Sequence, residues 1–202
     1  AFDCVTASTS RIRRDVDPVK LPVGIEMGRF RPGESDRVAA LATDGGPTAA
    51  DAPVVGYSGR MAHKKNVDEI LRLAERLPEV RFELVGEGPV RAELEADAPP
   101  NVRFHDFLPR GDLPGFYAAL DVFVTASTCD TLGLSTLEAN ACGTPVAAAD
   151  VAPFDETIES ENGARFALGD LEDMERAVRD CLDGDRDTRA AVEQFSVERT
   201  ID

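Results

Sequence analysis

The sequence predicts an α/β fold built on a doubly wound parallel sheet, Rossmann-like in its layers. From residue 53 onward, short apolar runs alternate with runs at helical spacing, and the loops between them are short. The pattern is clearest at 122–148, where an apolar strand, a polar loop, Gly133, a helical run at 134–141 and a second apolar run at 145–148 follow one another. Strand, glycine turn, helix and strand form the repeating unit of a parallel sheet.

The remaining elements follow from the same two patterns. A helix at 67–77 is indicated by Ile70, Leu71, Ala74 and Leu77, which recur at helical spacing. In chain order, the other expected elements are strands at 54–57, 82–85 and 102–104 and helices at 90–96, 113–120 and 171–182, with a last helix near the end of the chain. Asn162-Gly163 predicts a tight turn.

The first quarter of the chain differs from the rest. We expect residues 1–52 to be the end of a preceding domain and a linker, and residues 53–202 to be the main domain. Residues 2–7 are expected to form one strand, and a basic helix to start at 10–14. Residues 41–52 are rich in Ala, Gly, Asp and Thr, as linkers are. Because the chain opens without Met and inside an apolar run, we expect it to begin within a larger protein.

The charge balance is strongly acidic. The net charge is −16, and only three of the 22 basic residues are lysines. Such a surface argues against binding to nucleic acid. It suits a protein kept soluble in concentrated salt, where screening removes the self-repulsion, so we expect a halophilic source.

The cysteines and histidines do not suggest a metal site. Cys4, Cys129, Cys142 and Cys181 lack any C-x-x-C spacing and are expected to be reduced thiols of a cytoplasmic protein. The only two histidines, at 63 and 105, are isolated in the sequence, and no run approaches eighteen apolar residues. We therefore expect neither a metal nor a transmembrane helix.

The loop and helix after the strand at 122–124 carry the most specific chemistry. Gly133 would let the backbone pass close to a ligand, and the amides of Gly133, Leu134 and Ser135 would form a phosphate site at the helix start. Glu138 lies one turn further on the same face, and Asp130 offers a second carboxylate. From spacing alone, a structural turn with Glu138 on a solvated face is an equally good interpretation.

A basic cluster follows the first strand of the main domain. Two of the three lysines, Lys64 and Lys65, are adjacent and lie close to Arg60. In so acidic a chain this cluster favours a diphosphate clamp, although a solvated basic loop is the simpler alternative. Gly86-Glu87-Gly88-Pro89 is a lone G-x-G without the third glycine of the dinucleotide fingerprint, which argues against NAD binding.

The two acids lie in a recognisable frame. Asp130 and Glu138, eight positions apart, with Gly133-Leu134 between them and Gly143-Thr144-Pro145-Val146 after them, resemble the paired-acid signature of retaining glycosyltransferase family four. That family has the GT-B fold, two Rossmann-like domains with the donor site mostly on the C-terminal one. The family usually has Glu at the position of Asp130 and Phe at that of Leu132.

The resemblance extends over nearly the whole chain. Gly59-Arg60 with Lys65 resembles the phosphate-binding pair of the family, whose usual glycine is replaced here by Asn66. Residues 21–32 resemble the interdomain segment, and 151–158 the acidic turn that closes the site. Phe107 and Leu108 fall in the loop that in the family lies against the nucleotide base.

The resemblance implies the donor-binding half of a retaining, metal-independent glycosyltransferase, with a remnant of the N-terminal domain and no cofactor other than a nucleoside diphosphate sugar as donor. Arg60 and Lys65 would bind the diphosphate, Glu138 the ribose and Asp130 the sugar. The further partners would be the N-terminal domain, an acceptor and, through that missing half alone, a membrane surface. The chain by itself is expected to be inactive. Two alternatives stay open: a nucleotide-sugar epimerase of the same fold, and a non-catalytic nucleotide-binding module.

Overall fold

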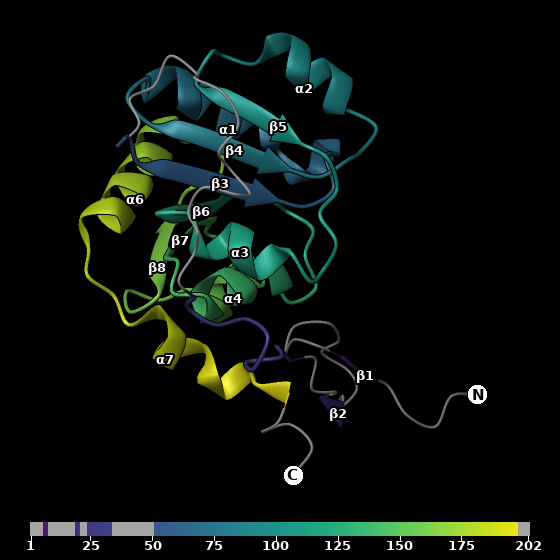
Figure 1. Cartoon of the computed structure of the whole chain (residues 1–202), viewed down its shortest axis with the longest axis vertical. Coiled ribbons are helices and arrows are strands. Elements are labelled where there is room, and N and C mark those ends of the chain that lie inside the picture. Colours follow the sequence, from purple (N-terminus) through teal and green to yellow (C-terminus); the bar gives the residue numbers. More distant parts are fainter. Residues whose placement is uncertain (1–5, 8–18, 21–23, 34–50, 198–202) are drawn as a thin grey trace.

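The computed structural model describes residues 6–7, 19–20, 24–33 and 51–197. Its centre is a parallel sheet of six strands in the order β5-β4-β3-β6-β7-β8 (Figure 1). The strands are β3 Val54–Ser58, β4 Arg81–Val85, β5 Val102–His105, β6 Val122–Thr125, β7 Val146–Ala149 and β8 Gly163–Phe166. The predicted doubly wound parallel sheet is confirmed.

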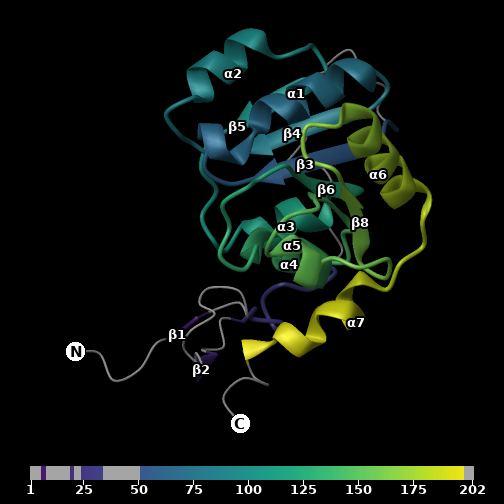
Figure 2. The ribbon, with the colours of Figure 1, turned by 180° about the vertical axis from the view of Figure 1, so that it is seen from behind.

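Helices cover both faces of this sheet. They are α1 Val67–Arg76, α2 Arg91–Asp97, α3 Leu113–Ala118, α4 Leu134–Ala141, α5 Phe154–Thr157, α6 Leu171–Asp183 and α7 Thr188–Val192, with 3₁₀ turns η1 His63–Lys65 and η2 Glu193–Phe195. Figure 1 shows α3 and α4 in front of the sheet, and Figure 2 shows α1 and α6 on the opposite face. Because both faces are covered, every residue of β3, β6 and β7 is buried.

Each face of the sheet has its own apolar core. One core lies between the sheet and α1 and α6, and includes Leu73, Phe82 and Val178. The other lies beneath α3 and α4, and includes Phe116 and Phe123. In the middle of β3, Leu120 packs so closely over Gly56 that a Cβ there would lie 2.3 Å from its side chain. These two cores fix the strand ends on which the candidate site is built.

The predicted elements differ from the structure mainly at β8. The helix expected at 134–141 has those limits in the structure, and most other limits differ by one or two residues. The residues after the expected turn at Asn162-Gly163 form β8, which pairs with β7 from Gly163 onward. Its sequence Gly-Ala-Arg-Phe contains the exposed Arg165 and therefore lacks the apolar run that would predict a strand.

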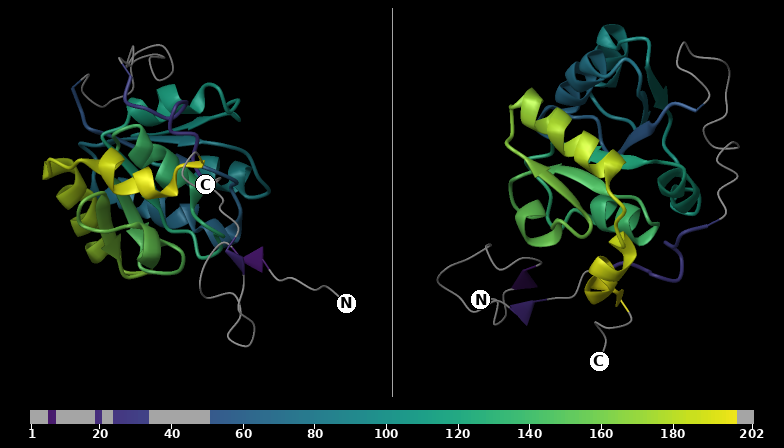
Figure 3. Two further views of the ribbon diagram at one scale, coloured as in Figure 1. Left: turned by 90° about the horizontal axis from the view of Figure 1, so that it is seen from below. Right: turned by 90° about the vertical axis from the view of Figure 1, so that its left-hand side faces the viewer.

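The segment 24–33 packs against the end of the chain, as Figure 3 shows beside α7. Ile25 and Phe30 are fully buried in the core beneath α3 and α4. Ile25 forms a parallel bridge with Ser196, and the Arg189 guanidinium donates to the carbonyls of Met27, Phe30 and Ala141 at 2.6–2.9 Å. Residues 24–33 are thereby fixed to the sheet domain.

The rest of the N-terminal part is described only in short pieces. Two-residue strands β1 Thr6–Ala7 and β2 Val19–Lys20 pair in parallel. The start of the strand expected at 2–7, the helix start expected at 10–14 and most of the linker expected at 41–52 lie outside the described residues. In the part of the chain that is described, no helix combines the length and apolar character needed to cross a membrane.

Candidate functional site

The candidate site lies at the carboxyl ends of β3 and β6. The chain runs from β3 outward through β4 to β5, then returns to the other side of β3 to form β6. The order of strands therefore reverses between β3 and β6, and such switch points are where open α/β sheets bind ligands. Arg60 and Lys65 follow β3, and Asp130, Gly133, Leu134 and Ser135 follow β6. The two predicted clusters, some 65 residues apart in sequence, meet at this edge.

Direct bonds join the two loops. The Lys65 ammonium donates to both Asp130 carboxylate oxygens, at 3.0 and 2.9 Å, and to the Cys129 carbonyl at 3.3 Å. The Thr128 amide donates to the Lys64 carbonyl at 3.1 Å. Lys65, which we expect to bind phosphate, is thus paired with Asp130, which we expect to bind the sugar. The sequence did not indicate this pairing.

Asn66 fits this junction although the family that the sequence resembles usually has glycine there. Its φ is +48°, in the left-handed region that glycine adopts easily and asparagine tolerates better than most residues. Its side-chain amide donates to the Ala126 carbonyl at 2.9 Å, just past the end of β6. Asparagine therefore supplies the required backbone conformation and ties the β3 loop to the β6 loop.

Glu138 lies on the inner face of α4 and is only 6% exposed. The Tyr117 hydroxyl donates to one carboxylate oxygen at 3.2 Å, and the Arg110 guanidinium lies 3.4 Å from the other. Burial raises the pKa of Glu138, and Arg110 and the Tyr117 hydrogen bond offset part of that increase. The interpretation that Glu138 lies on a solvated face is wrong, because this side of α4 packs against α3.

Tyr117 links Glu138 to the end of β3. Its hydroxyl lies 2.8 Å from the Ser58 Oγ, and its ring packs edge-on against Phe123, with centroids 5.6 Å apart. Burial raises the pKa of Tyr117, and the negative charge of Glu138 raises it further. The Tyr117 hydroxyl therefore stays protonated and can donate. No local pattern in the sequence marks Ser58, Tyr117 or Arg110 as site residues. They come from three separate segments, and only folding brings them to Glu138.

A pocket of about 350 Å³ opens over this network. Six of the ten predicted site residues line it: Gly59, Arg60, Phe107, Leu108, Ser135 and Glu138. The other four, Lys65, Asp130, Gly133 and Leu134, lie outside its lining. Phe107 is 69% exposed, the most exposed large apolar side chain among the described residues, and lies at the pocket mouth. The pocket thus has an apolar wall, a cation and a carboxylate.

Gly133 has a different structural reason from the one expected. It starts α4 with φ of +68°, a left-handed conformation that favours glycine. A Cβ at Gly133 would lie 2.7 Å from the Phe154 ring, so the space left by the missing side chain is filled by protein. Phe154 thus gives a packing reason for glycine at this position, and the approach of the Gly133 backbone to a ligand stays a prediction. The backbone amides at the start of α4 remain candidates for an anion, since no side chain caps this helix.

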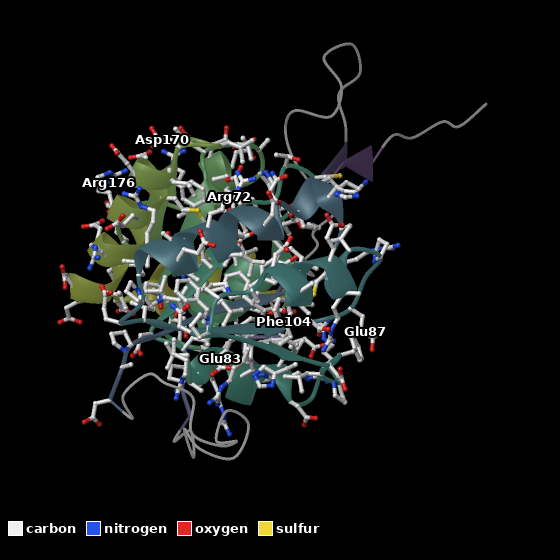
Figure 4. The ribbon with its side chains drawn as sticks, turned by 90° about the horizontal axis from the view of Figure 1, so that it is seen from above. Arg72, Glu83, Glu87, Phe104, Asp170 and Arg176 are labelled. Atoms are coloured by element: carbon white, nitrogen blue, oxygen red, sulfur yellow. The ribbon has the colours of Figure 1, made fainter. Side chains whose placement is uncertain are left out.

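The G-x-G segment after β4 also serves packing. A Cβ at Gly86 would meet the Gly59 carbonyl oxygen at 2.0 Å, and a Cβ at Gly88 would meet that of Met61 at the same distance. Both glycines let the β4 loop lie directly against the β3 loop that carries Arg60. Figure 4 shows Glu87, from the same segment, on the opposite side of the molecule from Asp170 and Arg176 of the α6 region.

A larger pocket of about 490 Å³ lies elsewhere, between α1 and α2. It contains none of the ten predicted site residues, and its lining combines apolar side chains with exposed charged ones such as Arg72, Glu75 and Asp97. His63 is part of its lining, whereas His105 lies 2.6 Å from the buried Glu83 carboxylate. No three Asp, Glu, His or Cys side chains of the described residues gather as a metal site. We therefore place the candidate site at the β3–β6 edge.

Fold and site together define a Rossmann-like α/β domain whose switch-point edge offers groups for an anion and for hydroxyls. The chain belongs to the family of glycosyl transferases group 1, which it matches over residues 52–184.

Curated relatives agree with this assignment. The chain is 33% identical over 186 residues to a sulfoquinovosyl transferase of Arabidopsis thaliana, covering 88% of this chain and 35% of the relative. It is 32% identical over 192 residues to a 2-deoxystreptamine glucosyltransferase of Streptomyces kanamyceticus, covering 89% and 48%. The chain thus spans between a third and a half of these relatives.

Solved structures show the same fold. Sucrose-phosphate synthase of Thermosynechococcus elongatus superposes with a TM-score of 0.82 at 23% identity, over 99% of this chain and 56% of that one. HepE of Anabaena, solved in complex with UDP and glucose, gives a TM-score of 0.76 at 23% identity, over 88% and 53%. Both likenesses concern about half of the larger protein.

Proposed function

We propose that this chain is the donor-binding half of a retaining glycosyltransferase that takes its sugar from a nucleoside diphosphate sugar. Family membership supports a transferase. The location of the donor site rests on one observation. The β3–β6 switch point brings Arg60, Lys65, the start of α4, Glu138 and Asp130 to one edge, beside a pocket with an apolar mouth. Each part of a nucleotide sugar finds a chemical partner there.

The diphosphate would lie between Arg60, Lys65 and the first amides of α4. When the glycosidic bond of the donor breaks, negative charge grows on the leaving diphosphate, and fixed positive groups stabilise it. Arg60 is exposed at the pocket wall, and the amides of Leu134 and Ser135 begin a helix whose dipole favours an anion. These groups supply positive charge from the chain itself, and the proposal assigns no metal or other cofactor.

The remaining parts of the donor are assigned by chemistry. Glu138 can accept two hydroxyl hydrogen bonds once Arg110 moves aside, which suits the ribose. Phe107 and Leu108 present an apolar surface for the base. Asp130 would accept from hydroxyls of the transferred sugar. Because the HepE structures contain UDP and glucose, UDP-glucose is the first donor to test. Because the chain spans half or less of its curated relatives' length, transfer itself is proposed to need a further domain that would bind the acceptor.

Arg60→Ala tests the clamp. Calorimetry in molar potassium chloride should show UDP binding weakened about tenfold or more, the range for a charge-assisted hydrogen bond. Arg72→Ala is the matched control, because it removes the same charge from the other pocket, on α1. GDP and ADP are run in parallel to identify the base. Equal losses in the two variants, or a loss only in Arg72→Ala, would contradict the site.

A further inference from the structure

In the proposed function Lys65 binds the diphosphate and Asp130 the sugar, yet in the structure the two side chains bind each other. Both Asp130 carboxylate oxygens accept from the Lys65 ammonium, at 2.9 and 3.0 Å. The side chains are 19% and 22% exposed, so water replaces only part of this interaction when it is broken. A ligand that occupies only one partner leaves the other charge unpaired.

The surrounding loops hold the pair in place. Thr128 bonds to the Lys64 carbonyl through both its amide and its hydroxyl, at 3.1 and 3.2 Å. Asn66 bonds to Ala126 across the same junction. Tyr57 lies close enough for the Asp130 charge to raise the Tyr57 pKa, after the larger effect of burial. The backbone on both sides is therefore tied, and a ligand must separate the side chains rather than the loops.

We propose that Asp130 competes with the bound diphosphate for Lys65, so that the site prefers the whole nucleotide sugar to the free nucleoside diphosphate. This inference rests on the proposed function. The whole donor compensates both partners, since its phosphate replaces Asp130 on Lys65 and its sugar hydroxyls replace Lys65 on Asp130. Free diphosphate compensates only Lys65 and leaves a carboxylate facing its own negative charge. After the sugar has left, Asp130 would recapture Lys65 and help to release the product.

Asp130→Asn isolates the competition, because it removes the charge and keeps the size. The dissociation constant of UDP should fall about fivefold, the factor for a partly exposed ion pair, whereas that of UDP-glucose should stay the same or rise. The measured quantity is the ratio of the two dissociation constants. Asp130→Ser, with circular dichroism on both variants, covers the case in which one variant fails to fold.

Two further variants show where the effect arises. In a Lys65→Met background, Asp130→Asn should increase the affinity for UDP less than it does in the wild-type background, because the cation for which Asp130 competes is gone. Asp68→Asn, on α1 and paired with Arg72, removes the same charge from the acidic surface and should leave the ratio unchanged. Equal tightening in Asp68→Asn would reduce the effect to general repulsion and overturn the inference.

The failures of the inference and of the proposed function are distinguishable. If Arg60→Ala weakens UDP but Asp130→Asn leaves it unchanged or weaker, the site stands and the competition is refuted. If wild type binds none of UDP, GDP and ADP, both are overturned.

Discussion

The two halves of the candidate site are built differently. The half proposed to bind the ribose (the ribose half) is a buried network in which Ser58, Tyr117 and Glu138 come from β3, α3 and α4, each fixed by a core. The half proposed to bind the diphosphate (the diphosphate half) consists of Arg60 and the Lys65–Asp130 pair, on loops with partial access to water. In the first half the acid is fixed by buried partners, and only the half-exposed Arg110 must move for a ligand. In the second half a carboxylate of the protein occupies the cation that would bind the ligand.

This difference predicts where affinity and selectivity originate. Groups held on helices and strands keep their geometry and contribute directly to affinity. Groups that form an ion pair must first be separated from each other. Their net contribution to affinity therefore depends on the contacts that the ligand makes with both partners. Substitutions in the ribose half should therefore weaken every nucleotide, whereas those at Asp130 should change the ranking of ligands.

Glu138→Gln should give the largest effect in the ribose half. A charged acceptor contributes about 1.5–3 kcal/mol to a hydrogen bond, so UDP should weaken roughly tenfold or more. The affinity for the UDP analogue that lacks both ribose hydroxyls should fall only slightly in this variant. An equal loss for this analogue would remove Glu138 from ribose binding.

The same variant should be more stable than wild type near neutral pH. Burial raises the Glu138 pKa, so the folded chain binds this proton more tightly than the unfolded chain. Ionised Glu138 therefore lowers stability above its raised pKa, and the penalty vanishes below the ordinary pKa of glutamate. Each ~1 kcal/mol of destabilisation that the substitution removes should raise the melting temperature by about 2–4 °C. Melts at fixed molar salt should show this gain shrinking as pH falls; a gain independent of pH would contradict the cause.

Tyr117→Phe should give a smaller loss, because it removes one hydroxyl and keeps the packed ring. A neutral hydrogen bond contributes about 0.5–1.5 kcal/mol, so UDP should weaken about two- to tenfold. Tyr117 acts through Glu138, so the analogue without ribose hydroxyls should be unaffected, and the loss should be absent in a Glu138→Gln background. A loss that persists there would mean that Tyr117 contributes only to folding or to another contact.

Much of the fold follows from local patterns. The strand at 122–124 could be predicted from its apolar run and the helix at 134–141 from the glycines at 133 and 143, because both are local signals. β8 could not, since an edge strand with one face in solvent carries few apolar residues.

The site was predicted only in part, for a similar reason. Residue types and a family resemblance indicated Arg60, Lys65, Asp130 and Glu138. The Lys65–Asp130 pair and the Tyr117 bridge join residues 65 and 21 positions apart, and no local pattern encodes such partners. Whether Glu138 faced solvent or protein likewise depended on the packing of α3 against α4.

A crystal structure of the chain with UDP-glucose would test the proposed donor site most directly. Uridine diphosphate should lie in the pocket of about 350 Å³, with its ribose hydroxyls on Glu138 and with Lys65 moved from Asp130 to the diphosphate. Nucleotide bound between α1 and α2, or a bound diphosphate above an intact Lys65–Asp130 pair, would contradict it.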